Sequence, residues 1–155
     1  MTEADHSALS RLRCREIMTK NVKTASSSSS LREVAALMRD GDMGAVPIVD
    51  DGKMIGIVTD RDIVVRGTAD GMETSTPVRV AMTSELFTVR PNDFVFEAVR
   101  LMGDKQVRRI PVIGDNGELA GIISMADVAL ETEDDLEIAE TLEEISSGAS
   151  FWGRS

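Results

Sequence analysis

The chain has 155 residues, a length typical of one compact domain or of two small ones. Hydrophobic residues make up 42% of it and aromatic residues only 3%, so its core must be built from aliphatic side chains and methionine. The net charge is −10, which disfavours nucleic-acid binding because that function needs basic surfaces. No apolar run approaches the roughly 20 residues of a membrane span, and the first residues lack a signal-peptide segment. We therefore expect a cytoplasmic protein without membrane contact.

Residues that could carry catalysis or bind a metal are scarce. Cys14 is the only cysteine and His6 the only histidine, so an intrachain disulfide and a zinc site are both excluded. The sequence also lacks the glycine-rich loop of nucleoside triphosphatases. We expect no catalytic residues, no metal and no required cofactor.

The first copy of an internal repeat begins with a lead that ends at Met18-Thr19, followed by an extended piece that holds Thr24. A helix is then predicted by apolar residues at helical spacing, namely Leu31, Val34, Ala35, Leu37 and Met38. Ser30 and Glu33 fit the capping box that begins such a helix. The run of serines at 26–30 is therefore interpreted as a loop and N-cap.

A hairpin and a second helix complete the first copy. Strands are predicted at 45–49 and 54–58, because both runs are rich in Val and Ile and are separated by the turn sequence Asp-Asp-Gly at 50–52. A helix is expected to start just after Thr59. The predicted unit is therefore β-α-β-β-α.

The second copy follows 64 positions later, and one inserted residue moves the offset to 65. The matched pairs include Met18 with Met82, Thr24 with Thr88, Pro47 with Pro111, Gly56 with Gly121, Thr59 with Ser124 and Asp62 with Asp127. Strands are expected at 109–113 and 119–123. Phe94 stands where the first copy has Ser30, so we expect Asp93 or Asn92 to cap the helix. A duplication of this length means that a site built by one copy can exist twice.

These repeated motifs resemble those of a tandem pair of CBS domains. Residues 55–63 read Ile-Gly-Ile-Val-Thr-Asp-Arg-Asp-Ile, and 108–113 read Arg-Arg-Ile-Pro-Val-Ile. The chain most resembles stand-alone bacterial pairs of the hypoxic-response type. The resemblance implies an α/β (α+β) fold in which two β-α-β-β-α units pack as a pseudo-twofold pair. It also implies a non-enzymatic regulatory module that binds AMP, ADP or ATP in the cleft between the repeats and that forms a homodimer.

The domain boundaries follow from the extent of the match. We expect the first CBS domain at 12–66, a linker at 67–78, the second domain at 79–131 and an acidic helix and tail at 132–155. The segment 131–144 holds eight carboxylates and no Lys or Arg, which is typical of a solvated helix face. The helix is expected at 132–146.

Thr59 and Asp62 are the first candidate ligand residues, and Ser124 and Asp127 repeat them. A hydroxyl at this position can reach a ligand phosphate, and a carboxylate has two oxygens that can accept both ribose hydroxyls. The same Thr-x-x-Asp spacing also suits a helix cap. The residues alone leave both interpretations open, and the resemblance favours nucleotide contact.

Arg108 and Arg109 form the second candidate group. The resemblance assigns phosphate binding to this position, and a guanidinium suits it through its bidentate geometry. The first copy has Gly44 and Ala45 instead, so phosphate contact is expected in one copy only. Arg61 could reach a phosphate, although a surface pair with a neighbouring aspartate is favoured.

Thr24 and Thr88 match the stretch whose backbone contacts adenine in the family, so both are assigned to the nucleotide site. The alternative to a sensor is a ligand-independent dimerisation or protein-interaction module, which would use 132–146 and Phe151-Trp152 to dock an unidentified protein partner. An enzyme with an unrecognised site is a third hypothesis.

Overall fold

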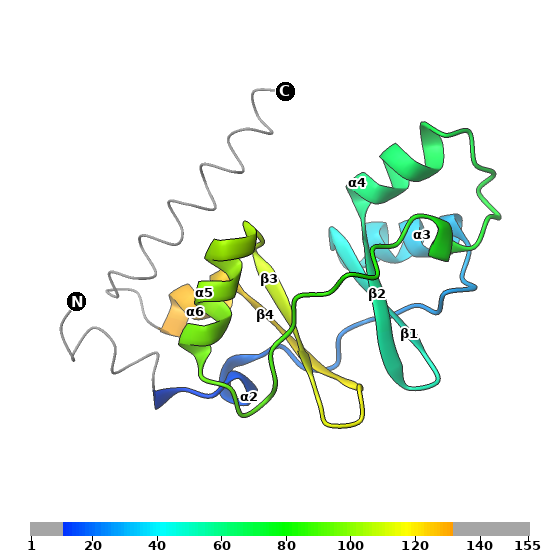
Figure 1. Cartoon of the computed structure of the whole chain (residues 1–155). Coiled ribbons are helices and arrows are strands. Elements are labelled where there is room, and N and C mark those ends of the chain that lie inside the picture. The colour runs from blue at the N-terminus through cyan, green and yellow to red at the C-terminus, as the bar shows by residue number, and fades with distance from the viewer. Residues whose placement is uncertain (1–10, 132–155) are drawn as a thin grey trace, which may run out of the picture. The chain divides into compact units, whose positions relative to one another are not determined.

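The computed structural model describes residues 11–131 (Figure 1). The helix predicted at 132–146 and Phe151-Trp152 lie outside the described residues. In chain order the elements are α2 (Cys14–Ile17), α3 (Leu31–Gly41), β1 (Ala45–Asp50), β2 (Lys53–Thr59), α4 (Asp60–Asp62), the π-helix η1 (Ile63–Thr68), the 3-10 helix η2 (Val78–Val80), α5 (Val95–Lys105), β3 (Arg109–Ile113), β4 (Leu119–Ser124) and α6 (Met125–Glu131). The predicted hairpins are therefore confirmed, with strand ends shifted by at most one residue, and helices lie where the two repeats predict them within 11–131. The first strand predicted in each unit is present only as a single bridge, at Ala25 and at Val89.

The described chain forms two compact units. Each unit contains the segment with the Met-Thr motif, called the lead, that begins the other repeat. The first-repeat unit consists of Val22–Leu86 and Asn116–Leu119. The described residues of the second-repeat unit are 11–21, 87–115 and 120–131. The lead that precedes the first repeat therefore belongs to the second-repeat unit, and the lead at 79–86 belongs to the first-repeat unit.

In the first-repeat unit, β1 and β2 form an antiparallel hairpin that two single bridges extend on either side. Ala45 pairs with Thr59 at its open end, and a bulge follows Ile48. Ala25 lies parallel to β1 at Ile48, while Thr83 pairs antiparallel with Ile57 of β2. The predicted turn is confirmed at Asp51 and Gly52, both of which have positive φ.

The second-repeat unit has the same arrangement, with the corresponding backbone hydrogen bonds. Val89 donates to the carbonyl of Pro111 at 3.1 Å, and Ile113 donates to the carbonyl of Val89 at 2.8 Å. The corresponding distances around Ala25 are also 3.1 and 2.8 Å. On the other edge, Thr19 pairs antiparallel with Ile122 of β4. The duplication in the sequence is therefore a duplication of backbone geometry.

Two glycines let the leads approach the strands closely. A Cβ atom on Gly121 would lie 2.7 Å from the carbonyl oxygen of Thr19 and 2.8 Å from the sulfur of Met18. A Cβ atom on Gly56 would lie 2.8 Å from the sulfur of Met82 and 3.0 Å from the carbonyl oxygen of Thr83. Both repeats therefore need glycine where the Met-Thr lead crosses the second strand of the hairpin.

The two long helices begin differently. The predicted capping box of α3 is confirmed, because the Ser30 hydroxyl accepts from the N–H of Glu33 at 3.0 Å. The prediction that Asp93 or Asn92 caps α5 is wrong, because Phe94 holds the N-cap position without a side-chain hydrogen bond. Asp93 instead accepts from the N–H of Arg90 at 2.8 Å, which stabilises the preceding turn.

The segment predicted as a linker packs on the start of α3. The N–H groups of Leu31 and Arg32 donate to the carbonyls of Thr76 and Thr74 at 2.9 and 3.1 Å. These N–H groups belong to the first turn of the helix, where no carbonyl of the helix itself can reach them. The Thr-rich stretch therefore serves as a backbone cap of α3.

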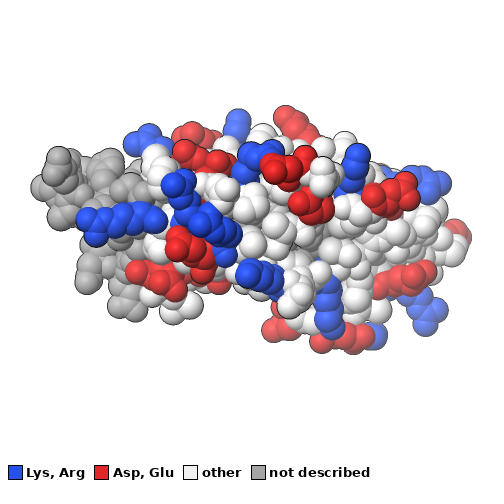
Figure 2. All heavy atoms as spheres, turned by 90° about the horizontal axis from the view of Figure 1, so that it is seen from below, with Lys and Arg blue, Asp and Glu red and all other residues white. Residues whose placement is uncertain are grey.

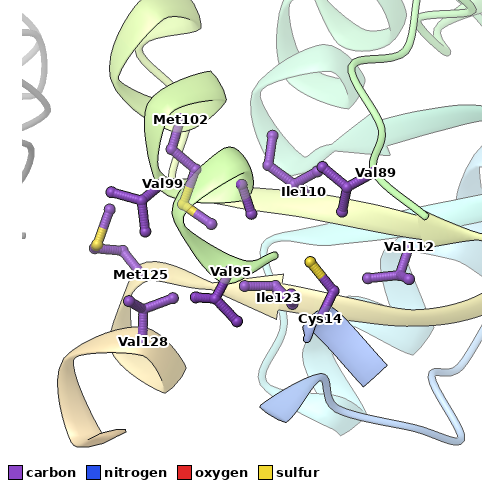
Figure 3. Close-up of a cluster of buried hydrophobic side chains, with 11 residues drawn as sticks. Cys14, Val89, Val95, Val99, Met102, Ile110, Val112, Ile123, Met125 and Val128 are labelled. Atoms are coloured by element: carbon purple, nitrogen blue, oxygen red, sulfur yellow. The ribbon is translucent and has the colours of Figure 1, made fainter. Parts of the chain in front are cut away.

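Each unit has its own hydrophobic core. The second-repeat core is drawn in Figure 3, where Val95, Val99 and Met102 of α5 face Met125 and Val128 of α6 next to Ile110 and Ile123 of the hairpin. The first-repeat core consists of Leu31, Val34, Met38, Val46, Ile48, Val58, Val78 and Ala81. Both are aliphatic and contain Met, which confirms the prediction from composition.

Candidate functional site

Thr59 and Asp62 cap the start of α4. The hydroxyl of Thr59 accepts from the N–H of Asp62 at 3.1 Å, and the carboxylate of Asp62 accepts from the N–H of Thr59 at 2.9 Å. Both residues are partly buried. The capping interpretation of this motif is therefore confirmed in the first repeat.

Ser124 and Asp127 repeat the cap at the start of α6. Both reciprocal hydrogen bonds between them measure 3.1 Å. The hydroxyl of Thr19 adds a third contact by donating to Oδ2 of Asp127 at 3.4 Å. Sequence reasoning did not assign Thr19 to the site, although its place in the repeated Met-Thr motif was a signal.

Capping leaves both pairs with capacity for a ligand. A hydroxyl has one donor and two acceptor positions, and the cap of Thr59 or Ser124 uses one acceptor position. A carboxylate has about four acceptor positions, of which the cap of Asp62 uses one and the contacts of Asp127 use two. The two interpretations of the motif are therefore compatible.

The residue directly before each hairpin is joined to this cap by a backbone hydrogen bond. In the second repeat, the N–H of Met125 donates to the carbonyl of Arg108 at 2.8 Å. In the first repeat, the N–H of Asp60 donates to the carbonyl of Gly44 at 3.0 Å. The fold therefore brings the backbone of Arg108 to the Ser124-Asp127 cap and that of Gly44 to the matching cap.

Arg108 and Arg109 are exposed and form no ion pair with any residue in 11–131. The first repeat has a carboxylate in this neighbourhood, because a Cβ atom on Gly44 would lie 3.7 Å from Oδ2 of Asp60. The N–H of Arg61 donates to the other oxygen of Asp60 at 2.8 Å. The predicted difference between the repeats, at Gly44 and Ala45, thus extends to a further position, Asp60 against Met125, which the sequence did not single out.

Thr24 and Thr88 are exposed residues directly before the parallel bridges of Ala25 and Val89. Each therefore lies on an extended segment beside the first strand of its hairpin. Within 11–131, neither threonine forms a hydrogen bond with the capping residues. Their assignment to a ligand site stays a prediction.

Cys14 is fully buried in the second-repeat core. Burial raises the pKa of its thiol to about 12, and the carboxylates of Asp93 and Glu97 add to the shift. No group of three or more His, Cys, Asp or Glu residues that could hold a metal ion is present in the part of the chain that the structure describes. Its helices also include none long and apolar enough to cross a membrane.

Charged side chains of both signs are interspersed over the face drawn in Figure 2. The described residues of the second-repeat unit hold nine Lys and Arg against seven Asp and Glu. The first-repeat unit holds seven Lys and Arg against eleven Asp and Glu. Over the described residues alone the second-repeat unit is slightly basic, but with 1–10 and 132–155 it has ten Lys and Arg against sixteen Asp and Glu, so both units are acidic as whole segments of the sequence.

The sequence matches the family model of the CBS domain twice, over residues 14–66 and 78–134. It is 39% identical over 116 residues to the CBS domain-containing protein YhcV of Bacillus subtilis, which covers 75% of this chain and 82% of that protein. It is 37% identical over 117 residues to hypoxic response protein 1 of Mycobacterium tuberculosis, covering 74% and 81%.

Solved structures show the same similarity. The crystal structure of Hypoxic Response Protein I, which holds two coordinated zinc ions, is 36% identical with a TM-score of 0.70 and covers 77% of this chain and 98% of that chain. The CBS domain pair of protein MJ0100, in complex with 5′-methylthioadenosine and S-adenosyl-L-methionine, is 25% identical with a TM-score of 0.68. That match covers 77% of this chain and 94% of the other.

Proposed function

The chain belongs to the CBS domain family, and from this premise we propose that it is a regulatory module that binds an adenosine nucleotide. The repeat and the mixed α and β fold expected from the sequence are confirmed by the family match and by the solved CBS pairs. The observation that carries the proposal is that a backbone hydrogen bond from Met125 holds Arg108 next to the Ser124-Asp127 cap. The hydroxyl and the carboxylate of this cap keep hydrogen-bonding positions that the cap does not use.

The proposed ligand contacts divide the nucleotide into three parts. Asp127 accepts the ribose hydroxyls, Ser124 donates its hydroxyl to the 5′-phosphate, and Arg108 and Arg109 neutralise the phosphate charge. The backbone at Thr88 contacts the adenine. In the first repeat, Asp62 and the backbone at Thr24 take the ribose and the adenine, and Thr59 takes the group at the 5′ position, without an arginine beside it. The choice among AMP, ADP and ATP, and the expected cleft between the repeats, stay predictions.

Regulation requires that the ligand distinguish two states of the protein. A ligand shifts a conformational equilibrium only as far as its affinities for the two states differ. We propose that nucleotide binding favours one state and that a partner protein in the cytoplasm binds that state. The protein itself is proposed to catalyse no reaction.

Isothermal titration calorimetry with AMP, ADP, ATP, S-adenosylmethionine and 5′-methylthioadenosine tests the proposal. We expect saturable binding of at least one of these ligands and a rise in melting temperature with ligand concentration. Absence of both effects at millimolar concentrations of all five compounds would contradict the proposal.

Variants of the cap separate ligand contact from capping. Asp127→Asn keeps an oxygen that can accept from the N–H of Ser124 but removes the carboxylate charge, so we expect weaker binding with little change in melting temperature. Ser30→Ala is the matched control, because it removes a capping box of the same type from α3. We expect it to lower stability by about 0.5–2 kcal/mol and leave nucleotide affinity unchanged. Equal effects of both variants on affinity and stability would favour capping alone.

A second candidate function is ligand-independent dimerisation. The observation in its favour is a set of exposed apolar side chains in the first-repeat unit, namely Val64, Val65, Met72 and Val80. We propose a second copy of the chain as the partner of these residues. Light scattering with the Val64→Asp variant tests this, and a dimer that persists in the variant would count against it.

A further inference from the structure

We infer that the two repeats select different adenosine ligands, with a 5′-phosphate bound at Ser124-Asp127 and a neutral or cationic 5′ group bound at Thr59-Asp62. This inference rests on the proposed function and adds the chemical class that each site takes. It comes from charge differences between two sites whose backbone geometry is the same.

The two sites can be compared because their frameworks match. Both caps are reciprocal, and the hydrogen bond from the first helical residue to the start of the hairpin measures 2.8 Å in one repeat and 3.0 Å in the other. A difference in ligand choice must therefore come from side chains. Four matched positions at or next to this hydrogen bond differ in charge, namely Gly44 against Arg108, Ala45 against Arg109, Asp60 against Met125 and Arg61 against Ala126.

The first repeat places a carboxylate close to where the second repeat places an arginine. A Cβ atom on Gly44 would lie 3.7 Å from Oδ2 of Asp60, and the Cβ atom of Arg108 occupies the equivalent point in the second repeat. The N–H of Arg61 holds the carboxylate of Asp60 in place through its other oxygen, at 2.8 Å. An anionic 5′ group is therefore attracted in one repeat and repelled in the other.

Neighbouring charges point in the same direction. Arg108, Arg109 and Asp127 give the second repeat two cations and one anion, whereas Asp60, Arg61 and Asp62 give the first repeat one cation and two anions. A phosphate monoester carries a charge of about −1.5 to −2 at neutral pH, so it senses this difference strongly.

Calorimetry with two probes tests the inference, namely AMP and 5′-deoxy-5′-methylthioadenosine, which lacks the phosphate. We expect one tight AMP site per chain. We expect the neutral probe to bind a second site when AMP is already saturating. Arg108→Gln should weaken AMP binding by about 10- to 100-fold, the range for a lost hydrogen bond to a charged group. It should leave the neutral probe unaffected.

A gain of function provides the sharper test. Asp60→Asn, alone and combined with Gly44→Arg, removes the anion and adds the cation that the second repeat has. Loss of one carboxylate a few ångströms from a phosphate should strengthen AMP binding at the first repeat by about 3- to 30-fold. Asp51→Asn is the control, because it removes a charge at the β1–β2 turn, the opposite end of the hairpin from Thr59.

The outcomes separate this inference from the proposed function. AMP binding to both repeats with equal affinity, or an Asp60→Asn variant with unchanged AMP affinity, overturns the inference while the nucleotide-binding module stands. Failure of every adenosine compound to bind overturns both. Retained melting temperatures in Arg108→Gln and Asp60→Asn confirm that affinity changes do not come from unfolding.

Discussion

Substitution of Gly121 by alanine tests why the lead of one repeat belongs to the unit of the other. A Cβ atom at this position would lie 2.7 Å from the carbonyl oxygen of Thr19, a backbone atom that cannot rotate away. The chain then has two choices. Thr19 keeps its place and the contact is overpacked, or the lead moves away and its bridge to Ile122 is lost.

Both outcomes lower the free energy of unfolding by similar amounts. Overpacking of a tight contact costs about 1–3 kcal/mol. Loss of the two hydrogen bonds between Thr19 and Ile122, which measure 2.8 and 3.0 Å, costs about 0.5–1.5 kcal/mol each. We therefore expect Gly121→Ala to lower stability by about 1–3 kcal/mol, which corresponds to a fall in melting temperature of roughly 2–12 °C for a chain of this size.

A graded series of alanine variants makes this prediction specific. Gly56→Ala should cost less, because its shortest contact is the flexible side chain of Met82 and its backbone contact is 3.0 Å. Gly44→Ala should be neutral or slightly stabilising, because its nearest atom is at 3.7 Å and alanine restricts the unfolded chain. Urea unfolding followed by circular dichroism measures all three. Equal stability of the Gly121→Ala and Gly44→Ala variants would refute the close packing of the lead.

Two further substitutions and one labelling experiment test the cores and the loops. Ile123→Ala, at a fully buried position, should cost about 2–5 kcal/mol in urea unfolding, and a smaller loss would contradict the packing in Figure 3. Cys14, whose pKa is raised to about 12 by burial, should resist alkylation by iodoacetamide at pH 8 and react in urea; stoichiometric labelling of the native protein would oppose this. The hydroxyl of Ser27 lowers the pKa of Asp50 below its ordinary value, so this carboxylate stabilises the fold above its unfolded pKa and less as the pH falls. Ser27→Ala should therefore lower stability at pH 7 more than at pH 3, and an equal loss at both would contradict the assignment.

The elements of the fold could be predicted from the sequence because local signals agree there. The hairpins have Val-rich and Ile-rich strands around turns with Gly52 and Gly117, and α3 has a complete capping box. The cap of α5 could not be predicted in the same way. Phe94 takes the N-cap position and stacks on Phe96 while Arg13 lies 3.9 Å above its ring, and contacts between distant residues leave no local pattern.

The candidate site could be predicted in part for the same reason. The reciprocal cap of Ser124 and Asp127 depends on residues three positions apart, so its spacing identifies it. The contact of Thr19 with Asp127 joins residues far apart in the chain. Asp60 lies near Gly44, the residue of the first repeat that matches Arg108 in the second. This difference in charge becomes apparent only when the structures of the two hairpins are compared. The exchanged leads are likewise a property of tertiary packing.

A crystal structure of the chain grown with AMP tests whether the Ser124-Asp127 site binds an adenosine nucleotide. We predict that the ribose hydroxyls donate to the carboxylate of Asp127 and that the 5′-phosphate lies next to Ser124 and Arg108. AMP bound away from these residues, or the site empty at millimolar AMP, would contradict it.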